Sequence, residues 1–308
     1  MSTRSGGVSQ SLPDVFGGEA PIIATDLPEV AEWLTDSGVS SIPLTEVMSI
    51  TEGAVLAVNA TPETIWFAQK SQPGVRKIHL VQSVHGGDNH TVRYTITQWL
   101  VADPWACAQR LADIATAIKS SSGRFSLTGL DTDLTVRPRG QVGLIYLDDP
   151  LIKPGECVSG AAFFEIGLAN LKIGPGSVFL VSGHCRARGM IAARDSVLSA
   201  APEPAEWVEY RHCIAEAGVD LHICDNQLVA CLLDGRDIKD EIAKWTGGYG
   251  LRITECSIGT NRQVLTGIDW SLNSLMNEGA QGIHLAVGLP DDGMHFDFIC
   301  PEVALVAG

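Results

Sequence analysis

The sequence has no excess of basic residues and no long apolar run. Lysine and arginine number 21 against 36 aspartate and glutamate residues, so the formal net charge is −15 over 308 residues. Binding to nucleic acid or to an anionic membrane requires a basic surface, so we expect neither as a partner. No stretch approaches the roughly 18 consecutive apolar residues of a transmembrane helix, and no membrane span is predicted.

Paired cysteines, phosphate-binding loops and a signal peptide are also missing. None of the eight cysteines belongs to a CxxC pair or has the spacing of a zinc knuckle. Most of them lie in apolar stretches, which predicts buried, reduced thiols. The glycine pairs lack the spacing and the lysine of a P-loop. The segment Met1–Gly7 has no apolar core, so we expect a cytoplasmic protein without a leader peptide.

The composition is that of a folded protein, with 45% hydrophobic and 19% charged residues. At roughly 150 residues per domain the length predicts two domains, each with its own core. The helix predicted over residues 104–121 ends in a Ser/Gly run and marks the boundary. We therefore predict an N-terminal α/β domain over residues 1–124, followed by a β-rich, mainly antiparallel domain over residues 125–308.

Local patterns predict the elements of the N-terminal part. A second helix is expected over Leu27–Ser37, with Asp26 as its N-cap and Val30, Trp33 and Leu34 on one face. Residues 1–20 are rich in Gly, Ser and Pro and are predicted to form a loose arm. Runs of β-formers predict strands over Gly53–Asn59, Thr64–Ala68, Arg76–Val84 and Thr91–Thr97.

Beyond Phe125 the pattern changes to β-type segments separated by Gly and Asp/Asn turns. Short helices are predicted near residues 203–217 and over Asp237–Thr246. The predicted strands are Gln141–Leu147, Ser177–Ser182, Val219–Cys224, Gln227–Leu233, Leu251–Ile258, Gly282–Val287 and Phe296–Ile299.

Two histidines and an aspartate near the C-terminus form the strongest chemical pattern. In an extended strand residues i and i+2 share a face, so His295 and Asp297 can present an imidazole and a carboxylate together. The strand before carries His284, and the short Leu289–Met294 loop returns the chain antiparallel. Two His and one Asp on neighbouring strands match a facial triad for Fe(II), Mn or Zn with open coordination positions. The alternative is a solvated His-x-Asp pair beside a core histidine.

Glu255 is a fourth candidate because it interrupts an otherwise apolar strand. An unpaired carboxylate there is costly, so it needs a cation, a hydrogen-bond network or an exposed face. The other histidines have simpler interpretations. We expect His85 and His90 to flank a solvated turn, His79 to be packed in a strand, and His184 to belong to a surface basic cluster or to bind an acidic group. His212 and His222 carry no signal.

Several motifs occur in the order known from one family of metalloenzymes. They include Thr128–Thr135, Lys153–Cys157, Gln227–Gly235, Glu255–Asn261, Asn277–Gly279, Gly282–Gly288 and His295–Asp297. Together these motifs, spread from about residue 125 to 308, resemble the C-terminal region of aminopeptidase T-like metallopeptidases. Their relatives, the 2,5-dihydroxypyridine 5,6-dioxygenases, share the same signature.

The resemblance implies which residues hold metal. In that family the positions of Glu156, Glu255, His284, His295 and Asp297 hold metal. The peptidase branch is similar to a two-metal hydrolase, in which paired cations clamp a water molecule. The dioxygenase branch uses one non-haem iron, with open positions for an aromatic diol-like substrate and oxygen.

Three departures from the peptidase pattern bear on the choice of branch. The chain is shorter than the peptidases and closer to the dioxygenases in length. The loop between His284 and His295 lacks the catalytic tyrosine of the peptidases. About 30 extra residues lie between Glu156 and Glu255, including the Trp207–His212 segment. Of the two branches, the first two departures favour the dioxygenase.

Three functional hypotheses follow. The first is a mononuclear metalloenzyme, with Fe(II) favoured over Zn, Co or Mn, that acts on a small, cyclic or aromatic molecule in the manner of a ring-cleaving dioxygenase. In it His284, His295 and Asp297 are ligands, and Glu255 is a ligand or an acid/base. The second is a two-metal aminopeptidase or amidase with Glu156 as an added ligand. The third is a non-catalytic scaffold that kept the fold. Exposed strand edges predict a homodimer.

Overall fold

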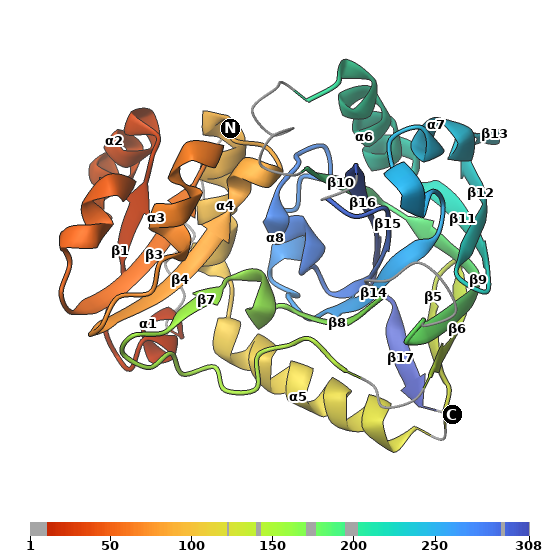
Figure 1. Cartoon of the computed structure of the whole chain (residues 1–308), viewed down its shortest axis with the longest axis horizontal. Coiled ribbons are helices and arrows are strands. Elements are labelled where there is room, and N and C mark those ends of the chain that lie inside the picture. Colours follow the sequence, from red (N-terminus) through yellow and green to blue (C-terminus); the bar gives the residue numbers. More distant parts are fainter. Residues whose placement is uncertain are drawn as a thin grey trace.

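The computed structural model describes residues 11–121, 123–139, 143–170, 177–194, 203–290 and 293–307. Within these ranges the chain forms three sheets, one parallel and two antiparallel (Figure 1). The predicted α/β plus β-rich fold class is confirmed. No helix of the described ranges is both long enough and apolar enough to cross a membrane.

The first sheet is parallel and belongs mostly to the N-terminal part. Its order is β2-β1-β3-β4-β7, with β1 (Ile22–Thr25), β2 (Ser41–Pro43), β3 (Gly53–Asn59), β4 (Val75–Val81) and β7 (Cys157–Ser159). The helices of this part are α1 (Leu12–Val15), α2 (Pro28–Asp36), α3 (Ile65–Gln69), α4 (Asn89–Val101) and α5 (Pro104–Ser120), with short 3₁₀ turns at Leu44–Ser49, Pro62–Thr64 and Gln82–Val84. Strand β7 lies beyond residue 124 in sequence, and the predicted domain boundary stays a prediction.

The second sheet, which carries the candidate site, is antiparallel with the order β10-β16-β15-β14-β8. Its strands are β8 (Glu165–Ala169), β10 (Gly189–Arg194), β14 (Ile253–Gly259), β15 (Gly282–Val287) and β16 (Met294–Pro301). Helix α8 (Leu275–Glu278) and the 3₁₀ turns Ala161–Phe163 and Val264–Thr266 belong to the connections around it.

The third sheet has the order β13-β12-β11-β9-β6-β5-β17. Its strands are β5 (Phe125–Gly129), β6 (Thr132–Pro138), β9 (Phe179–Ala187), β11 (Val219–Cys224), β12 (Gln227–Leu233), β13 (Arg236–Asp237) and β17 (Ala304–Ala307). Helices α6 (Ala205–Ala217) and α7 (Lys239–Ala243), together with the 3₁₀ turn Gly247–Tyr249, complete this part.

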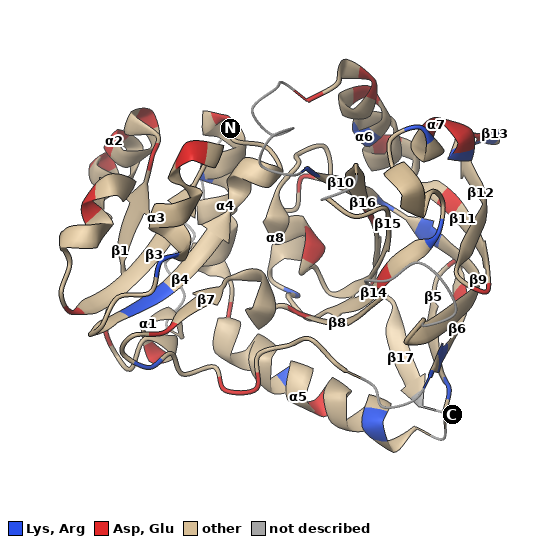
Figure 2. Ribbon diagram, in the orientation of Figure 1, with Lys and Arg blue, Asp and Glu red and all other residues tan. Residues whose placement is uncertain are grey.

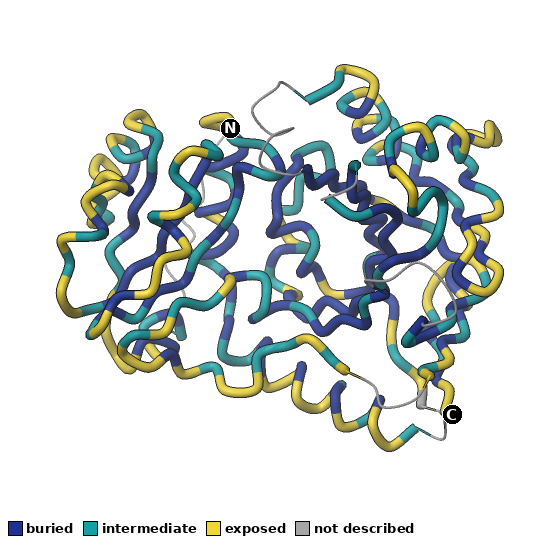
Figure 3. Tube along the Cα trace, in the orientation of Figure 1, coloured by how far each residue is buried: buried dark blue, intermediate teal, exposed yellow. Residues whose placement is uncertain are grey.

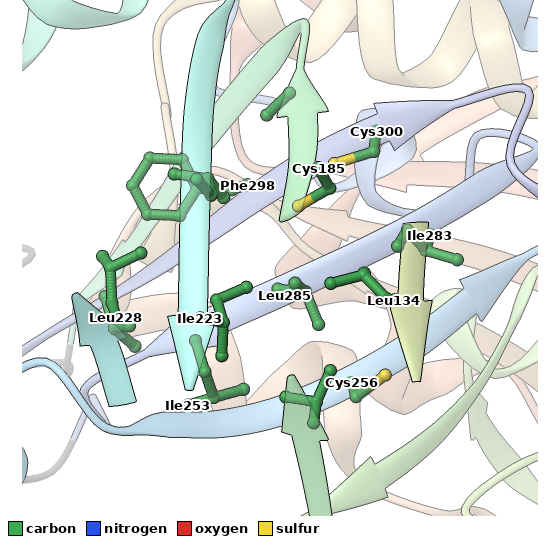
Figure 4. Packing of buried hydrophobic residues seen from close by; sticks show 14 of the residues in the cluster. Leu134, Cys185, Ile223, Leu228, Ile253, Cys256, Ile283, Leu285, Phe298 and Cys300 are labelled. Carbon is green, nitrogen blue, oxygen red and sulfur yellow. The ribbon is translucent and has the colours of Figure 1, made fainter. Parts of the chain in front are cut away.

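The two antiparallel sheets pack against each other and enclose the largest apolar core. Figure 4 shows Cys185 from β9 and Cys256, Leu285 and Phe298 from the second sheet in this core. Because side chains alternate across a strand, each strand of the second sheet gives one set of residues to the core and the other set to the opposite face. All eight cysteines are free and five are buried, as the sequence predicts. The strands are mostly buried, whereas α2 and α5 carry exposed positions (Figure 3).

Two predicted strands of the N-terminal part are helical. Residues 64–68 fall in a 3₁₀ turn and α3, and residues 91–97 fall within α4. Their β-branched residues suggested strands, but Asp88 caps α4 by accepting bonds from the His90 and Thr91 amides, at 2.9 and 3.1 Å. The buried positions of α4 then follow a helical spacing, so tertiary packing overrides local propensity.

Three further expectations need correction. Asp26 does not cap α2, whose N-cap is Leu27. Its carboxylate instead accepts the Ala60 and Thr61 amides, at 2.8 and 2.9 Å, and so ties the end of β1 to the end of β3. The described part of the expected arm is packed, since Leu12, Val15 and Phe16 are buried. Of the expected strand over residues 141–147, residues 141 and 142 lie outside the described ranges, and the rest forms only an isolated bridge through Ile145.

Candidate functional site

The face of the second sheet that points away from the large core carries the candidate residues. His295 and Asp297 lie on β16, His284 on β15 and Glu255 on β14. Strand pairing places Ala286 directly between Glu255 and Asp297 in one row of the sheet. Its small side chain leaves room above the sheet for the two carboxylates and the imidazoles to approach each other.

These four side chains, which we call the His–carboxylate cluster, lie within a few ångströms of one another. His284 Nε2 is 3.3 Å from Glu255 Oε1 and 3.8 Å from Asp297 Oδ1. His295 Nε2 is 3.1 Å from Asp297 Oδ1 and 3.9 Å from Glu255 Oε2. The structure thus brings together the two histidines and two of the three carboxylates that the sequence singles out.

Both histidines turn the same ring nitrogen toward the carboxylates because backbone carbonyls bind the other one. His295 Nδ1 is 2.9 Å from the Gly288 carbonyl, and His284 Nδ1 is 3.4 Å from the Glu278 carbonyl. A carbonyl only accepts, so each Nδ1 carries a proton, and each ring would offer its Nε2 lone pair to a metal ion once the proton on Nε2 is lost. Metal-binding histidines are commonly oriented in this way.

Electrostatics in the cluster favour the charged forms of its members. Burial lowers the pKa of His295, but the charge and hydrogen bond of Asp297 outweigh it and raise that pKa to about 9. Burial raises the pKa of Asp297, yet His295 holds it at about 2. The pKa of His284 is raised well above its usual value against the effect of burial, through Glu255 and Asp297. The cluster thus pairs anionic carboxylates with protonated, positively charged imidazole rings.

Two additional carboxylates, which the sequence analysis did not single out, lie beside His284. Glu165 Oε2 on β8 is 3.8 Å from His284 Nδ1. Burial raises the pKa of Glu165 to about 7, and burial with the charges of Asp297 and Glu165 raises that of Glu278 well above its usual value. Figure 2 shows the acidic position on α8 near the centre of the molecule, away from the acidic positions on the outer helices.

A third histidine faces the cluster from the N-terminal part. His85 follows the turn after β4 and is 7% exposed, so the predicted solvated turn is wrong at this position. Burial lowers its pKa to about 4, and the charges of Asp297 and His295 also act on it. Its Nδ1 is buried without a hydrogen-bond partner among the described residues. His85 is therefore a neutral imidazole beside the cluster.

Polar contacts hold the N-terminal part against the segment that carries Glu278. Gln82 Nε2 donates to the Asn273 carbonyl at 2.7 Å. The hydroxyls of Thr95 and Ser274 are 2.7 Å apart, and Tyr94 donates to Asn277 Oδ1 at 2.6 Å. These buried contacts fix α4 relative to α8, so the side chains from the two parts keep one arrangement.

The donor set of the cluster suits a divalent cation. Asp297 Oδ2 and Glu165 Oε2 are buried and have no hydrogen-bond partner in the described ranges. Buried carboxylate oxygens without donors are costly unless a cation compensates them. Imidazole with carboxylate is the ligand combination of Fe(II), Mn and Zn sites. Within those same ranges, however, no three such side chains are arranged as a formed metal site. The side chains are therefore of the types that bind such a metal, but in this structure they contact one another in His–carboxylate pairs.

Glu156, the remaining predicted site residue, is not brought to the cluster. It is exposed and directly precedes β7 at the edge of the parallel sheet. Its carboxylate accepts the Lys153 amide at 2.8 Å within its own turn. Glu165, nine residues later, lies beside His284 instead. The signal that identified Glu255, a lone carboxylate in an apolar strand, also applies to Glu165 after Phe163 and Phe164.

One protein family matches nearly the whole chain. The family described as "Crocagin biosynthetic protein CgnE/B" matches residues 18–307. No curated protein matches the sequence.

Two solved structures are similar to this chain at low sequence identity. One is the 2,5-dihydroxypyridine dioxygenase from Pseudomonas putida KT2440, with 9% identity, a TM-score of 0.51, and coverage of 96% of this chain and 90% of that one. The other is wild-type AmpT from Thermus thermophilus, with 14% identity, a TM-score of 0.45, and coverage of 92% and 89%. The similarity to the dioxygenase is therefore a distant one, of fold alone.

Proposed function

Because the chain belongs to the crocagin biosynthetic protein CgnE/B family, we propose that it is a biosynthetic metalloenzyme acting on a small, cyclic or aromatic molecule. The observation that carries this proposal is the His–carboxylate cluster on one face of the second sheet. His284, His295 and Asp297 would hold the ion, with Glu255 as a fourth ligand or as an acid/base. The motif resemblance to the dioxygenase branch, together with the similar fold of one such dioxygenase, supports Fe(II) as the favoured ion.

A bound Fe(II) would supply open positions for a bidentate substrate and for oxygen. The protein's own residues would orient the metal ligands and the substrate. The Gly288 and Glu278 carbonyls fix the two imidazole rings, so Nε2 of each ring points into the site. His85, neutral and with an unpartnered Nδ1, would accept a hydrogen bond or a proton from a substrate hydroxyl.

A two-metal hydrolase is the second candidate, and one observation favours it. Glu165 lies near Nδ1 of His284, whereas Glu255 lies near Nε2, and the Glu278 carboxylate interacts electrostatically with both Glu165 and His284. A second cation there would explain why such acids are buried together. Glu165 then takes the place that the sequence analysis gave to Glu156.

The two candidates differ in metal stoichiometry. Protein stripped with a chelator and titrated anaerobically with Fe(II), and in parallel with Mn(II) and Zn(II), should bind one ion per chain if the first proposal holds. Two ions per chain, together with turnover of amino-acyl anilides and no oxygen uptake with 2,5-dihydroxypyridine-type diols, would favour the hydrolase.

Substitution locates the ion. His284→Gln should weaken binding by about 100-fold or more, because a ligand is lost from a buried site. His79→Gln is the matched control, since His79 is also a strand histidine, half-buried, but lies in the parallel sheet. Equal affinity in wild type and His284→Gln would refute the assignment.

A further inference from the structure

Two histidines and an aspartate form a row on the outer face of the third sheet, far along the chain from one another. His222 on β11 pairs directly with His184 on β9. His184 in turn pairs directly with Asp133 on β6. Directly opposed residues project to the same face, so the three side chains are neighbours across three adjacent strands (Figure 1).

The row is open to solvent and its side chains are not used elsewhere. His184, His222 and Asp133 are all exposed. The two imidazole rings stack with centroids 6.3 Å apart and ring planes at 29°. Among the described residues, no hydrogen bond or ion pair holds the side chain of any of the three.

Charges next to the row are already paired. Arg186 on β9 pairs with Asp220 on β11, two residues along each strand from His184 and His222. Its Nη1 donates to both carboxylate oxygens of Asp220, at 2.8 and 2.7 Å. Arg186 is therefore neutralised by a carboxylate of the neighbouring strand. The predicted basic cluster is thus in part an ion pair within the third sheet. Asp133, which has no ion-pair partner within the described ranges, adds a negative charge beside His184.

We propose that His184 and His222 chelate a divalent first-row transition ion, of the Cu²⁺, Ni²⁺ or Zn²⁺ class, at this surface. Directly opposed residues have Cβ atoms roughly 4.5–5.5 Å apart, which lets two imidazoles reach one ion at about 2.0–2.1 Å. Exposed rings rotate to do so without disturbing the core. Neutral imidazole selects Cu, Ni and Zn over Mg and Ca. Two ring nitrogens define the site, Asp133 contributes its charge, and water completes the coordination.

This site is independent of the His–carboxylate cluster. The cluster histidines are nearly buried, whereas the surface pair is exposed. A probe too bulky for the cluster therefore separates the two. Cu²⁺–iminodiacetate is suitable, because the chelate leaves free positions that two neighbouring imidazoles can fill.

The experiment titrates untagged protein with soluble Cu²⁺–iminodiacetate and follows the visible copper band. Wild type should bind one equivalent. His184→Gln and His222→Gln should each lower the affinity by about tenfold or more, and the double variant should lose little beyond either single variant, because chelation needs both rings. Asp133→Asn should weaken binding by a few-fold.

The matched control removes the same number of exposed imidazoles elsewhere. His90 and His212 are also exposed, so the double variant His90→Gln/His212→Gln should bind the probe like wild type. The proposal is overturned if that control loses as much affinity as the His184→Gln/His222→Gln variant, or if the two single losses simply add. All these positions are on the surface, and unchanged circular dichroism verifies that each variant folds.

Discussion

Gly167 on β8 gives the sharpest way to perturb the candidate site without substituting any of its proposed ligands. A methyl group added there would lie 2.5 Å from Ser257 Oγ and 3.2 Å from Glu255 Oε1. Ser257 is fully buried and donates a 2.6 Å hydrogen bond to that same Glu255 oxygen. Gly167→Ala must therefore displace the hydroxyl or the carboxylate.

The magnitude follows from these contacts. Overpacking a closed site costs about 1–3 kcal/mol, and losing a hydrogen bond to a charged group costs about 1.5–3 kcal/mol. Since displacement relieves part of the clash, we expect Gly167→Ala to lower the free energy of unfolding by about 2–4 kcal/mol. Disturbing a partner of a metal ligand should weaken metal binding by about 10–100-fold.

Denaturant unfolding and metal titration measure the two effects separately. Gly143→Ala is the matched control, because a methyl group there meets nothing within 4 Å; it should change stability by less than about 1 kcal/mol. In the double variant Gly167→Ala/Ser257→Ala the nearest Ser257 atom becomes Cβ, at 3.7 Å. The part of the stability loss that comes from the clash with the hydroxyl should return, whereas the part that comes from the lost hydrogen bond should remain, and metal affinity should stay low. Metal affinity within about twofold of wild type in Gly167→Ala would refute the reasoning.

Three further predictions concern the N-terminal part. Asp26→Ala should lower the free energy of unfolding by about 2–4 kcal/mol, because it leaves the Ala60 and Thr61 amides without their acceptor; a urea titration in which it matches Asp36→Ala would contradict this. Lys77→Met should cost a similar amount, since its buried ammonium donates to the Lys70 carbonyl and Gln72 Oε1, at 2.7 and 2.8 Å; unchanged urea stability would show that these bonds contribute nothing. Burial lowers the pKa of His79 from 6.5 to about 4 in the folded protein. Between these two pH values the unfolded chain therefore binds one more proton at His79 than the folded protein does, and the wild type loses stability as the pH falls from about 6.5 to 4. His79→Gln should flatten that fall by about 1–3 kcal/mol, and an identical pH profile would exclude the effect.

Local periodicity was sufficient to predict much of the β-rich part. Strands β11, β12 and β15 have the predicted bounds, and β15 pairs antiparallel with β16 as expected from the short connection. Alternation along one strand is a local property, so His295 and Asp297 could be placed on one face from sequence. The strand predicted over Thr91–Thr97 was wrong because the helical conformation of α4 depends on its N-cap and on packing.

The rest of the candidate site depends on long-range pairing. Glu165 joins the cluster only because β8 pairs with β14, about 90 residues later in the chain. His85 reaches it through the packing of the N-terminal part on α8, and His222 meets His184 through the register of β11 with β9. Register between distant strands is set by the buried faces of a whole sheet, which no short motif records.

Anomalous X-ray diffraction from crystals loaded with Fe(II) or Mn(II), recorded at the metal edge, would locate the bound ion directly. We expect a peak roughly 2.0–2.3 Å from Nε2 of His284, Nε2 of His295 and a carboxylate oxygen of Asp297. Loaded crystals without a peak at this cluster, or with metal only at the exposed His184–His222 pair, would contradict this expectation.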